Sequence, residues 1–151
     1  MKDIYNYLYY NEKLSSSGMP TPEQLKSVAQ AGVRVVINLA TSKSEGAIPN
    51  EKELVEANGM TYIHIPVDWN NPTKNDLSEF MNSMDAHKDE KILVHCQANY
   101  RATGFVALYR IRKLGWTKDD AFQDLWKIWN PEEYPIWQIF MDESLKDNLG
   151  I

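Results

Sequence analysis

Short apolar runs alternate along this chain with longer segments in which apolar residues recur at helical spacing. Three runs, at 34–39 (RVVINL), 61–66 (TYIHIP) and 91–95 (KILVH), are rich in β-branched and aliphatic residues. Their nearly continuous apolar character is typical of strands that are covered on both faces, as in a parallel sheet. The sequence therefore predicts three buried strands.

Helix start and stop signals fall between and after these runs. Thr21 and Gln24 flank Pro22 in the pattern of a capping box, and Gly32 follows as a stop, which predicts a helix over 22–31. Further helices are predicted over 50–58, from Thr73 with Leu77, Phe80, Met81 and Met84 on one side, over 102–113, over 117–129, and after Pro131. Helices and strands thus alternate along most of the chain.

This alternation predicts an α/β fold in which a central, mostly parallel sheet is flanked by helices. A chain of 151 residues with 43% hydrophobic content is long enough to bury one core and too short for two comfortable domains, so a single domain over 1–151 is expected. The tyrosine-rich segment 4–17 fits either an edge strand or a packing arm. The loop 41–50 is the nearest approach to a flexible connection.

The charge of the chain excludes several classes of protein. The formal net charge is -5, and nucleic acids and anionic membranes require clustered Lys and Arg, so binding to either is not expected. No run is apolar for long enough to span a bilayer. We therefore expect a soluble protein of the cytoplasm, or of the periplasm if a signal peptide has been removed.

The only cysteine lies in the stretch VHCQANYRATG (94–104), directly after the third predicted strand. In sheets of this kind, ligands bind beyond the carboxyl ends of the strands, where loops lead into helices. A helix N-terminus, loop N–H groups and the guanidinium of Arg101 would favour the thiolate of Cys96 and would hold a tetrahedral oxyanion. An inert buried thiol is the alternative, because free cysteines are commonly core residues.

The stretch HCQANYRATG resembles the signature loop of the cysteine-dependent protein tyrosine and dual-specificity phosphatases, which carry His-Cys, a short loop, Arg, and Ser or Thr. Upstream, SGMPTPEQLKSVAQAGVRVVINL and YIHIPVDWNNPT are similar to small bacterial phosphatase-like proteins of the dual-specificity group. The resemblance implies their fold and a reaction through phosphocysteine. Cys96 would attack phosphorus, Arg101 would bind the transferring phosphoryl group, and Asp68 would protonate the leaving oxygen.

The resemblance also gives supporting roles to the neighbours of Cys96. The hydroxyl of Thr103 would hydrogen-bond the sulfur, and His95 would fix the loop and tune the thiol. The expected contacts to substrate come from Gln97, Ala98, Asn99, Tyr100 and Ala102. No metal or cofactor is expected, because His64 and His87 have no partner at the spacing of metal ligands.

The loop is one residue shorter than in the phosphatases, with four residues rather than five between Cys96 and Arg101. Its length is instead similar to the loop of rhodanese-like sulfurtransferases, which carry a persulfide. The expected function is hydrolysis of phosphate monoesters, on a phosphorylated protein or a small molecule. Sulfur transfer, and phosphate binding with little turnover, are the alternatives. The physiological substrate and the oligomeric state are left open.

Overall fold

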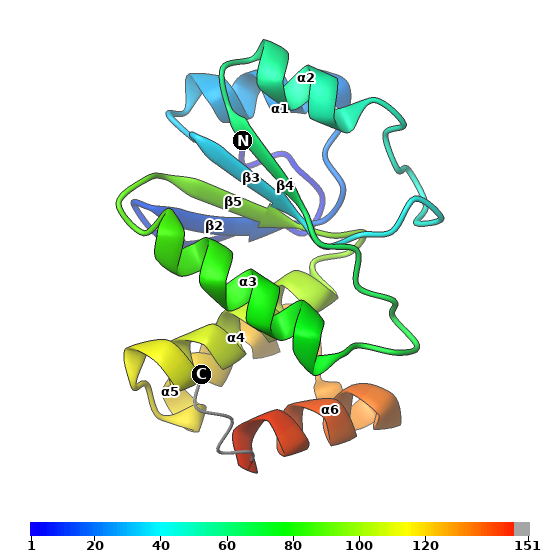
Figure 1. Ribbon diagram of the computed structural model, residues 1–151, viewed down its shortest axis with the longest axis vertical. Helices are drawn as coiled ribbons and strands as arrows, with labels where there is room; N and C mark the ends of the chain where they lie inside the picture. Colours follow the sequence, from blue (N-terminus) through cyan, green and yellow to red (C-terminus); the bar gives the residue numbers. More distant parts are fainter. Residues whose placement is uncertain (147–151) are drawn as a thin grey trace.

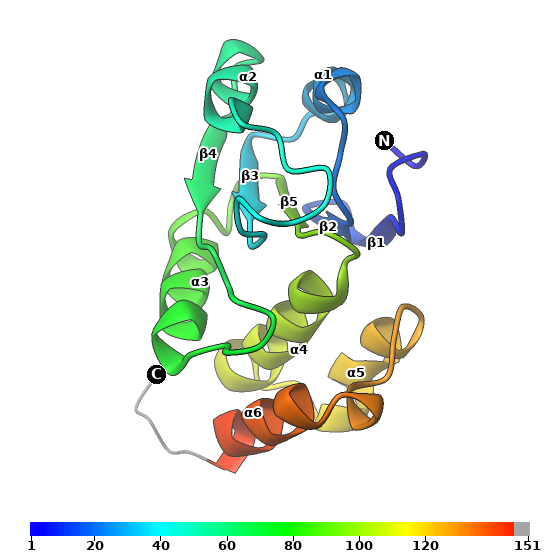
Figure 2. The same cartoon turned by 90° about the vertical axis from the view of Figure 1, so that its right-hand side faces the viewer.

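A computed structural model describes residues 1–146 of the chain and shows a five-stranded sheet between two layers of helices (Figures 1 and 2). The order of strands across the sheet is β1-β2-β5-β3-β4. The strands are β1 (Leu8–Asn11), β2 (Leu14–Ser17), β3 (Val35–Asn38), β4 (Thr61–His64) and β5 (Ile92–His95). Every pairing is parallel except the β1–β2 hairpin, so the predicted α/β fold with a mostly parallel sheet is confirmed.

The helices divide unequally between the two faces of the sheet (Figure 2). One face carries α1 (Pro22–Gln30) and α2 (Glu51–Ala57). The other carries α3 (Lys74–Ala86), α4 (Tyr100–Leu114), α5 (Lys118–Trp126), the short 3-10 helix η1 (Pro131–Glu133) and α6 (Pro135–Lys146). Among residues 1–146, no helix combines the length and the apolar character that crossing a membrane would require.

The side chains of β3 show how this division follows from the sequence. Successive residues of a strand point to opposite faces, so Val35 and Ile37 pack into the larger cluster, beneath α3 and α4, while Val36 packs into the smaller one, beneath α1 and α2. All three are fully buried, and each contributes about 1.5–3 kcal/mol to stability through loss of apolar surface from water. An uninterrupted apolar run is what a strand between two helical layers needs.

Two predictions about strands need correction. The strand at 61–64 is not covered on both faces: its residues are exposed or half-buried, because β4 forms one edge of the sheet. The segment 4–17, predicted as either an edge strand or a packing arm, combines both. Its second part forms the β1–β2 hairpin at the other edge, and its first part contacts the loop after β5.

Helix caps hold the elements in place as the sequence predicts. The side chain of Thr21 accepts from the N–H of Gln24, and the Gln24 side chain accepts from the N–H of Thr21, which completes a capping box at α1. Thr73 and Asp76 form the same box at α3. Such caps satisfy N–H groups that the first helical turn leaves unpaired and each stabilise a helix by about 1 kcal/mol.

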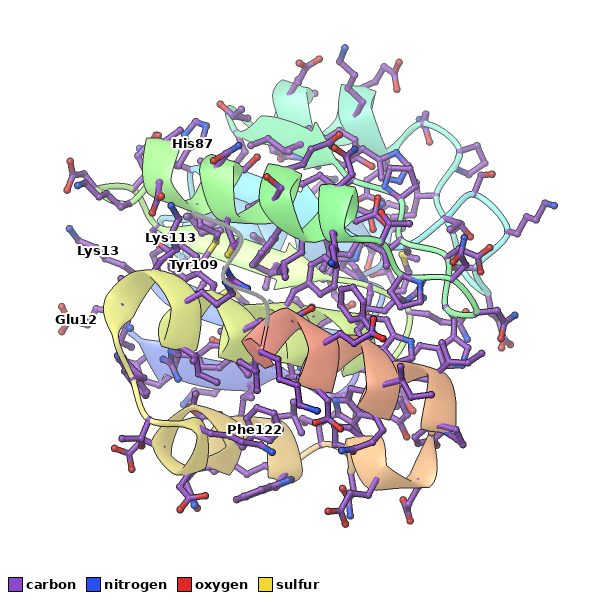
Figure 3. The ribbon with its side chains drawn as sticks, turned by 60° about the horizontal axis from the view of Figure 1, so that its bottom comes forward. Glu12, Lys13, His87, Tyr109, Lys113 and Phe122 are labelled. Atoms are coloured by element: carbon purple, nitrogen blue, oxygen red, sulfur yellow. The ribbon has the colours of Figure 1, made fainter. Side chains whose placement is uncertain are left out.

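At the end of α4 remote from Cys96, polar contacts fix this helix against α3 (Figure 3). The hydroxyl of Tyr109 donates to Asp85 over 2.8 Å, and the ammonium of Lys113 lies 3.5 Å from the same carboxylate. Burial raises the pKa of Tyr109 to about 12, so its hydroxyl stays protonated and remains a donor at neutral pH. These contacts are structural and leave the opposite end of α4 for ligand chemistry.

Candidate active site

The carboxyl ends of four strands form one row across the sheet. The register pairs Ser17 with His95, His95 with Asn38, and Asn38 with His64, which are the last residues of β2, β5, β3 and β4. Because these strands are parallel, the loops that follow them all leave from the same edge. Cys96 directly follows His95, the last residue of the central strand β5. The candidate nucleophile therefore lies at the middle of this row of strand ends, where ligands bind in such folds.

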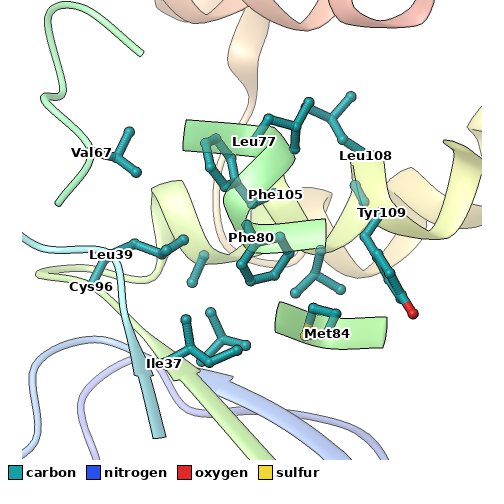
Figure 4. Close-up of a cluster of buried hydrophobic side chains, with 14 of the residues drawn as sticks. Ile37, Leu39, Val67, Leu77, Phe80, Met84, Cys96, Phe105, Leu108 and Tyr109 are labelled. Carbon is teal, nitrogen blue, oxygen red and sulfur yellow. The ribbon is translucent and has the colours of Figure 1, made fainter. Parts of the chain in front are cut away.

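Cys96 lies at the boundary between the core and a cavity. It has no exposed surface and belongs to the larger hydrophobic cluster, where Figure 4 shows it beside Leu39. Its N–H donates to the carbonyl oxygen of Ser17 over 3.3 Å, which continues the strand pairing for one more residue. Cys96 therefore lies at the inner end of that cavity, with no surface open to solvent.

The backbone of the loop after Cys96 offers hydrogen-bond donors. Asn99 has a left-handed conformation (φ 68°), which turns the chain sharply into α4. Within the described residues, no acceptor is found for the N–H groups of Gln97, Ala98, Tyr100 or Arg101. Unpaired N–H groups at the start of a fifteen-residue helix, together with the helix dipole, favour an anion at this point.

Arg101 is a buried cation, with 6% of its surface exposed. One guanidinium nitrogen, Nη1, donates to the carbonyl oxygen of Val67 over 2.8 Å. Among residues 1–146, no carboxylate forms an ion pair with it. A buried charge without a counterion is costly, so the environment of Arg101 is suited to binding an anion.

Two adjoining cavities meet at Trp69, Gln97 and Arg101. The first, here called the cysteine cavity, has a volume of about 330 Å³ and is lined by Trp69, Cys96, Gln97, Ala98, Tyr100, Arg101 and Tyr134. The second, the aspartate cavity, has a volume of about 420 Å³ and is lined by Thr41, Ser42, Lys43, Ser44, Asp68, Trp69, Gln97 and Arg101. The structure thus brings Cys96 and Asp68 to neighbouring hollows that share an arginine.

Asp68 is exposed and borders the aspartate cavity. Its Oδ1 accepts from the N–H of Asn70 over 2.9 Å, and its carbonyl oxygen accepts from the N–H of Asn71 over 3.0 Å, as in an Asx turn. The hydrogen bond between Arg101 and Val67 ties this loop to α4 at the preceding residue. The loop therefore places Asp68 at the edge of the sheet where Cys96 lies. Only Oδ1 takes part in the Asx turn.

The structure corrects the role given to Thr103. Its hydroxyl donates to the carbonyl oxygens of Asn99 (2.6 Å) and Tyr100 (3.1 Å) and accepts from Nε1 of Trp129 (2.8 Å). A hydroxyl has one hydrogen, and here backbone carbonyls of the first helical turn take it. Thr103 consequently supports the helix start and holds Trp129 instead of hydrogen-bonding the Cys96 sulfur.

Two further loop predictions differ from the structure. The helix begins at Tyr100, two residues before the predicted start, so Ala102 points into the core and lines neither cavity. Asn99 is also buried, and its side chain donates to the carbonyl oxygen of Asn6, away from both cavities. Of the five expected contacts, Gln97, Ala98 and Tyr100 line the cysteine cavity.

The aromatic side chains of Trp69, Tyr100 and Tyr134 form the walls of the cysteine cavity. Tyr100 stacks on Trp129, with ring centroids 5.0 Å apart and planes within 5°. Trp69 stacks on Trp137 at 5.3 Å, and Nε1 of Trp137 donates to the carbonyl oxygen of Trp69 over 2.8 Å. Tyr134 makes T-shaped ring contacts with Trp69 and Tyr100. Tyr134 was missed because nothing in the sequence joins η1 to the loop after β5.

A buried polar chain supports the cysteine loop from the other side. Nε2 of His95 lies 2.6 Å from Oε2 of Glu51, and Nδ1 lies 3.4 Å from the carbonyl oxygen of Cys96. The Nδ2 group of Asn38 donates to Oε1 of Glu51 over 3.2 Å and to the hydroxyl of Tyr62 over 3.0 Å. Glu51, from α2, was missed because a glutamate in a first helical turn is ordinarily exposed.

Within the described residues, no three His, Cys, Asp or Glu side chains are grouped as a metal site would need. The groups that surround Cys96 are instead N–H donors, a guanidinium and aromatic rings. This arrangement can hold a tetrahedral oxyanion next to a thiol by hydrogen bonding and charge.

Comparisons with known proteins agree with this geometry. The family model described as "Tc-R-P: Polymorphic toxin system, DSP-PTPase phosphatase" matches residues 12–114. Beta-lactamase hydrolase-like proteins of Xylella fastidiosa and Agrobacterium fabrum are 32% and 30% identical to this chain over 104 and 95 residues, which are 67% and 61% of its length. The chain spans about a quarter of those curated relatives, with 24% and 22% covered.

Solved structures add evidence on the fold. A DUF442 phosphatase from Shewanella putrefaciens is 40% identical, with a TM-score of 0.86 over 95% of this chain and 93% of that one. TpbA of P. aeruginosa, solved in complex with pTyr, shares the fold at 15% identity, with a TM-score of 0.72 over 90% of this chain and 82% of that one. The match of the family model to residues 12–114 shows that the chain belongs to the DSP-PTPase phosphatase family.

Proposed function

We propose that this phosphatase hydrolyses aryl phosphate monoesters, of which phosphotyrosine is the protein-borne example, through a phosphocysteine at Cys96. The observation that carries the proposal is the state of Arg101: a buried guanidinium without a carboxylate partner among residues 1–146, bordering the cavity at whose edge Cys96 lies. Phosphoryl transfer depends mainly on positioning and on neutralising charge, which a guanidinium and helix N–H groups supply.

The walls of the cysteine cavity support an aromatic leaving group. Trp69, Tyr100 and Tyr134 line it, and each is held by a ring contact with another aromatic residue. Rings prefer tilted or offset contacts with other rings, worth about 0.5–1.5 kcal/mol beyond the burial of their area. A phenyl ester would gain such contacts, whereas the shorter aliphatic chain of a phosphoserine would leave these walls uncovered.

The proposed reaction has two steps. In the first, the Cys96 thiolate attacks phosphorus, the S–P bond forms, the ester P–O bond breaks, and Asp68 gives its proton to the departing oxygen. In the second, water attacks phosphorus, the S–P bond breaks, and the Asp68 carboxylate takes a proton from that water. Arg101 and the loop N–H groups bind the phosphoryl oxygens in both steps.

A second candidate function is phosphate binding with little turnover. It is favoured by the burial of Cys96, which has no surface open to solvent. The loop between Cys96 and Arg101 is also short, with four residues. Both features affect access to the sulfur and leave the N–H groups and Arg101 in place to bind an oxyanion.

One set of assays separates these functions. Release of phosphate from p-nitrophenyl phosphate is compared for the wild type, Cys96→Ser and Arg101→Ala, while tungstate binding is measured by calorimetry. The proposal expects turnover in the wild type alone, with tungstate retained by Cys96→Ser and lost in Arg101→Ala. Equal inactivity of wild type and Cys96→Ser, with tungstate still bound, would favour the binding function. Thiocyanate formed from thiosulfate and cyanide would point to sulfur transfer instead.

A further inference from the structure

A further cavity, here called the Ser15 cavity, lies away from the cysteine loop. Its volume is about 560 Å³, and its lining includes Lys2, Asp3, Tyr7, Tyr9, Ser15 and Lys91. Lys91 directly precedes β5, whereas Cys96 directly follows the last residue of that strand, so the two residues lie at opposite ends of β5. Cavities of about 300–1,000 Å³ commonly hold small molecules.

The register of the strands places three lining residues on one face of the sheet. Tyr9 is opposite Ser15 in the β1–β2 pair, and Ser15 is opposite Leu93 in the β2–β5 pair. Lys91 comes two residues before Leu93, and side chains two positions apart in an extended chain point to the same face. Leu93 packs in the smaller hydrophobic cluster, beneath α1 and α2. A phenol, a hydroxyl and an ammonium therefore share this face.

The segment before β1 forms part of the cover on this face. Among residues 1–146, only α1 and α2 lie on this side of the sheet, and Figure 2 shows the N-terminal segment beside α1 on its way to β1. Ile4 of this segment packs with Leu25 and Val28 of α1. Tyr7 is half-buried, while Tyr9 leaves 57% of its surface exposed. These two rings give the Ser15 cavity an aromatic wall that can contact a ring of a ligand.

The hydroxyl of Ser15 is buried without a partner. Ser15 exposes 3% of its surface, and its Oγ has no hydrogen-bond partner among residues 1–146. The next two serines of the same strand are paired: Oγ of Ser16 lies 3.0 Å from the hydroxyl of Tyr10, and Oγ of Ser17 donates to the carbonyl oxygen of Gly18. A buried hydroxyl without a partner is costly, and alanine would avoid that cost. Ser15 is therefore suited to bonding a polar atom of a ligand in the cavity that it lines. 

Lys91 gives the Ser15 cavity a positive charge. Its Nζ donates to the carbonyl oxygen of Ala31 over 2.7 Å, and an ammonium has three hydrogens, so further donors remain. Within the described residues, no carboxylate forms an ion pair with this half-buried lysine. Lys2 and Asp3 also line the cavity, but both are exposed, opposite in charge and screened by solvent. The remaining charge at this cavity favours an anion.

We propose that the Ser15 cavity binds a small aromatic carboxylate, with its oxygens on Lys91 and Ser15 and its ring against Tyr7 and Tyr9. One ammonium matches a single negative charge, whereas a phosphate dianion would bring a second charge without a partner. An uncharged aromatic molecule would leave the ammonium and the buried hydroxyl unsatisfied. This site is independent of the chemistry proposed for Cys96, because the two lie at opposite ends of β5.

The test uses cinnamate as the probe and follows the backbone amide signals of the full chain by two-dimensional NMR. We expect saturable shifts at residues 7–15 and 91–93. Lys91→Gln removes the charge and keeps a donor for the Ala31 carbonyl, and it should weaken cinnamate binding about tenfold. Ser15→Ala should weaken binding by about the same factor without lowering the stability in urea, since its hydroxyl makes no hydrogen bond among residues 1–146.

Lys26→Gln is the matched control, because Lys26 is an exposed lysine of α1 that does not line the Ser15 cavity, and it should leave the affinity for cinnamate unchanged. Cinnamyl alcohol, which has the same ring without the charge, should bind about tenfold more weakly than cinnamate. Shifts confined to the cysteine loop, or equal affinity for the acid and the alcohol, would overturn the proposal. So would wild-type affinity in Lys91→Gln. If that variant fails to fold, wild-type affinity in Ser15→Ala decides against the proposal in the same way.

Discussion

The side chains of Asn6 and Asn99 join the segment before β1 to the cysteine loop by two hydrogen bonds to backbone carbonyl oxygens. The Asn6 amide donates to the carbonyl oxygen of Ala98 over 3.1 Å, and the Asn99 amide donates to the carbonyl oxygen of Asn6 over 2.8 Å. Both residues have a left-handed backbone, with φ of 53° and 68°. Asparagine tolerates this conformation better than most residues. The segment before β1 thereby fixes the middle of the cysteine loop.

This contact predicts that a change far from Cys96 in the sequence weakens anion binding. In Asn6→Asp, a carboxylate replaces the amide that donates to Ala98 and repels the carbonyl oxygen. We expect the free energy of unfolding to fall by about 1–3 kcal/mol and tungstate to bind about tenfold more weakly, because the loop loses its fixed geometry. Urea unfolding and calorimetry measure the two effects.

Asn82→Asp serves as the control, since Asn82 is exposed on α3. Asn6→Gly distinguishes the effect of the lost side chain from any effect of backbone strain, because glycine adopts the left-handed conformation without strain. It should weaken tungstate binding nearly as much as Asn6→Asp. Wild-type affinity in both Asn6 variants would show that the segment before β1 only adds stability.

Arg101 should not be replaceable by lysine. Lysine keeps the positive charge but cannot donate to the Val67 carbonyl and to two phosphoryl oxygens with one planar group. In Arg101→Lys we expect kcat/KM for an aryl phosphate to fall by about a hundredfold, equivalent to about 2.7 kcal/mol of transition-state binding. Arg34→Lys, at an exposed position, should change kcat/KM by less than about twofold. Activity within tenfold of wild type in Arg101→Lys would argue against bidentate binding.

Thr103 should matter for stability more than for chemistry. Thr103→Val removes the hydroxyl that accepts from Trp129 and donates to two carbonyl oxygens, so the buried indole N–H loses its partner. The expected cost is about 1–3 kcal/mol of unfolding free energy, measured in urea, with kcat preserved at a temperature where the variant is folded. Thr103→Ser keeps the hydroxyl and should lose less stability. A large fall in kcat for both variants would restore a role at the sulfur.

Much of the architecture follows from patterns that the chain carries locally. The run around β3 is apolar without interruption because both of its faces are buried, and capping residues such as Thr21 and Thr73 mark helix starts by satisfying free N–H groups. Cys96 could be predicted as a site residue because it directly follows an apolar strand and precedes Arg101 by five positions. These features depend on neighbours within a few positions.

The remainder depends on contacts between distant segments. The start of α4 lies before Ala102 because Asn99 adopts a left-handed turn that Asn6 secures, and no local pattern reports that contact. Glu51 is buried against His95 and Asn38, which belong to strands distant in the sequence. Tyr134 reaches the cysteine cavity through the path of the chain after α5. Thr103 has a hydroxyl at the expected spacing, but its hydrogen goes to backbone carbonyl oxygens and its oxygen accepts from Trp129.

Asp68 is expected to act as the acid for the leaving group. Asp68→Asn cannot give a proton, so kcat should fall about a hundredfold for phenyl phosphate, whose leaving oxygen is basic, and much less for p-nitrophenyl phosphate. The basic limb of the pH–rate profile should vanish in the variant. Asp76→Asn offers a comparison, since that carboxylate caps α3 and should affect unfolding alone. An equal loss for both esters would assign Asp68 a different role.

The covalent intermediate gives the most direct test of Cys96 as a nucleophile. The enzyme is mixed with p-nitrophenyl phosphate, quenched in acid within the first turnover, and digested for mass spectrometry of the peptide that contains Cys96. We expect the mass of one phosphoryl group on Cys96 in the wild type, more of it in Asp68→Asn when water attack is slowed, and none in Cys96→Ser. Phosphate release at wild-type rate from Cys96→Ser, or a phosphoryl group on another residue, would contradict the mechanism.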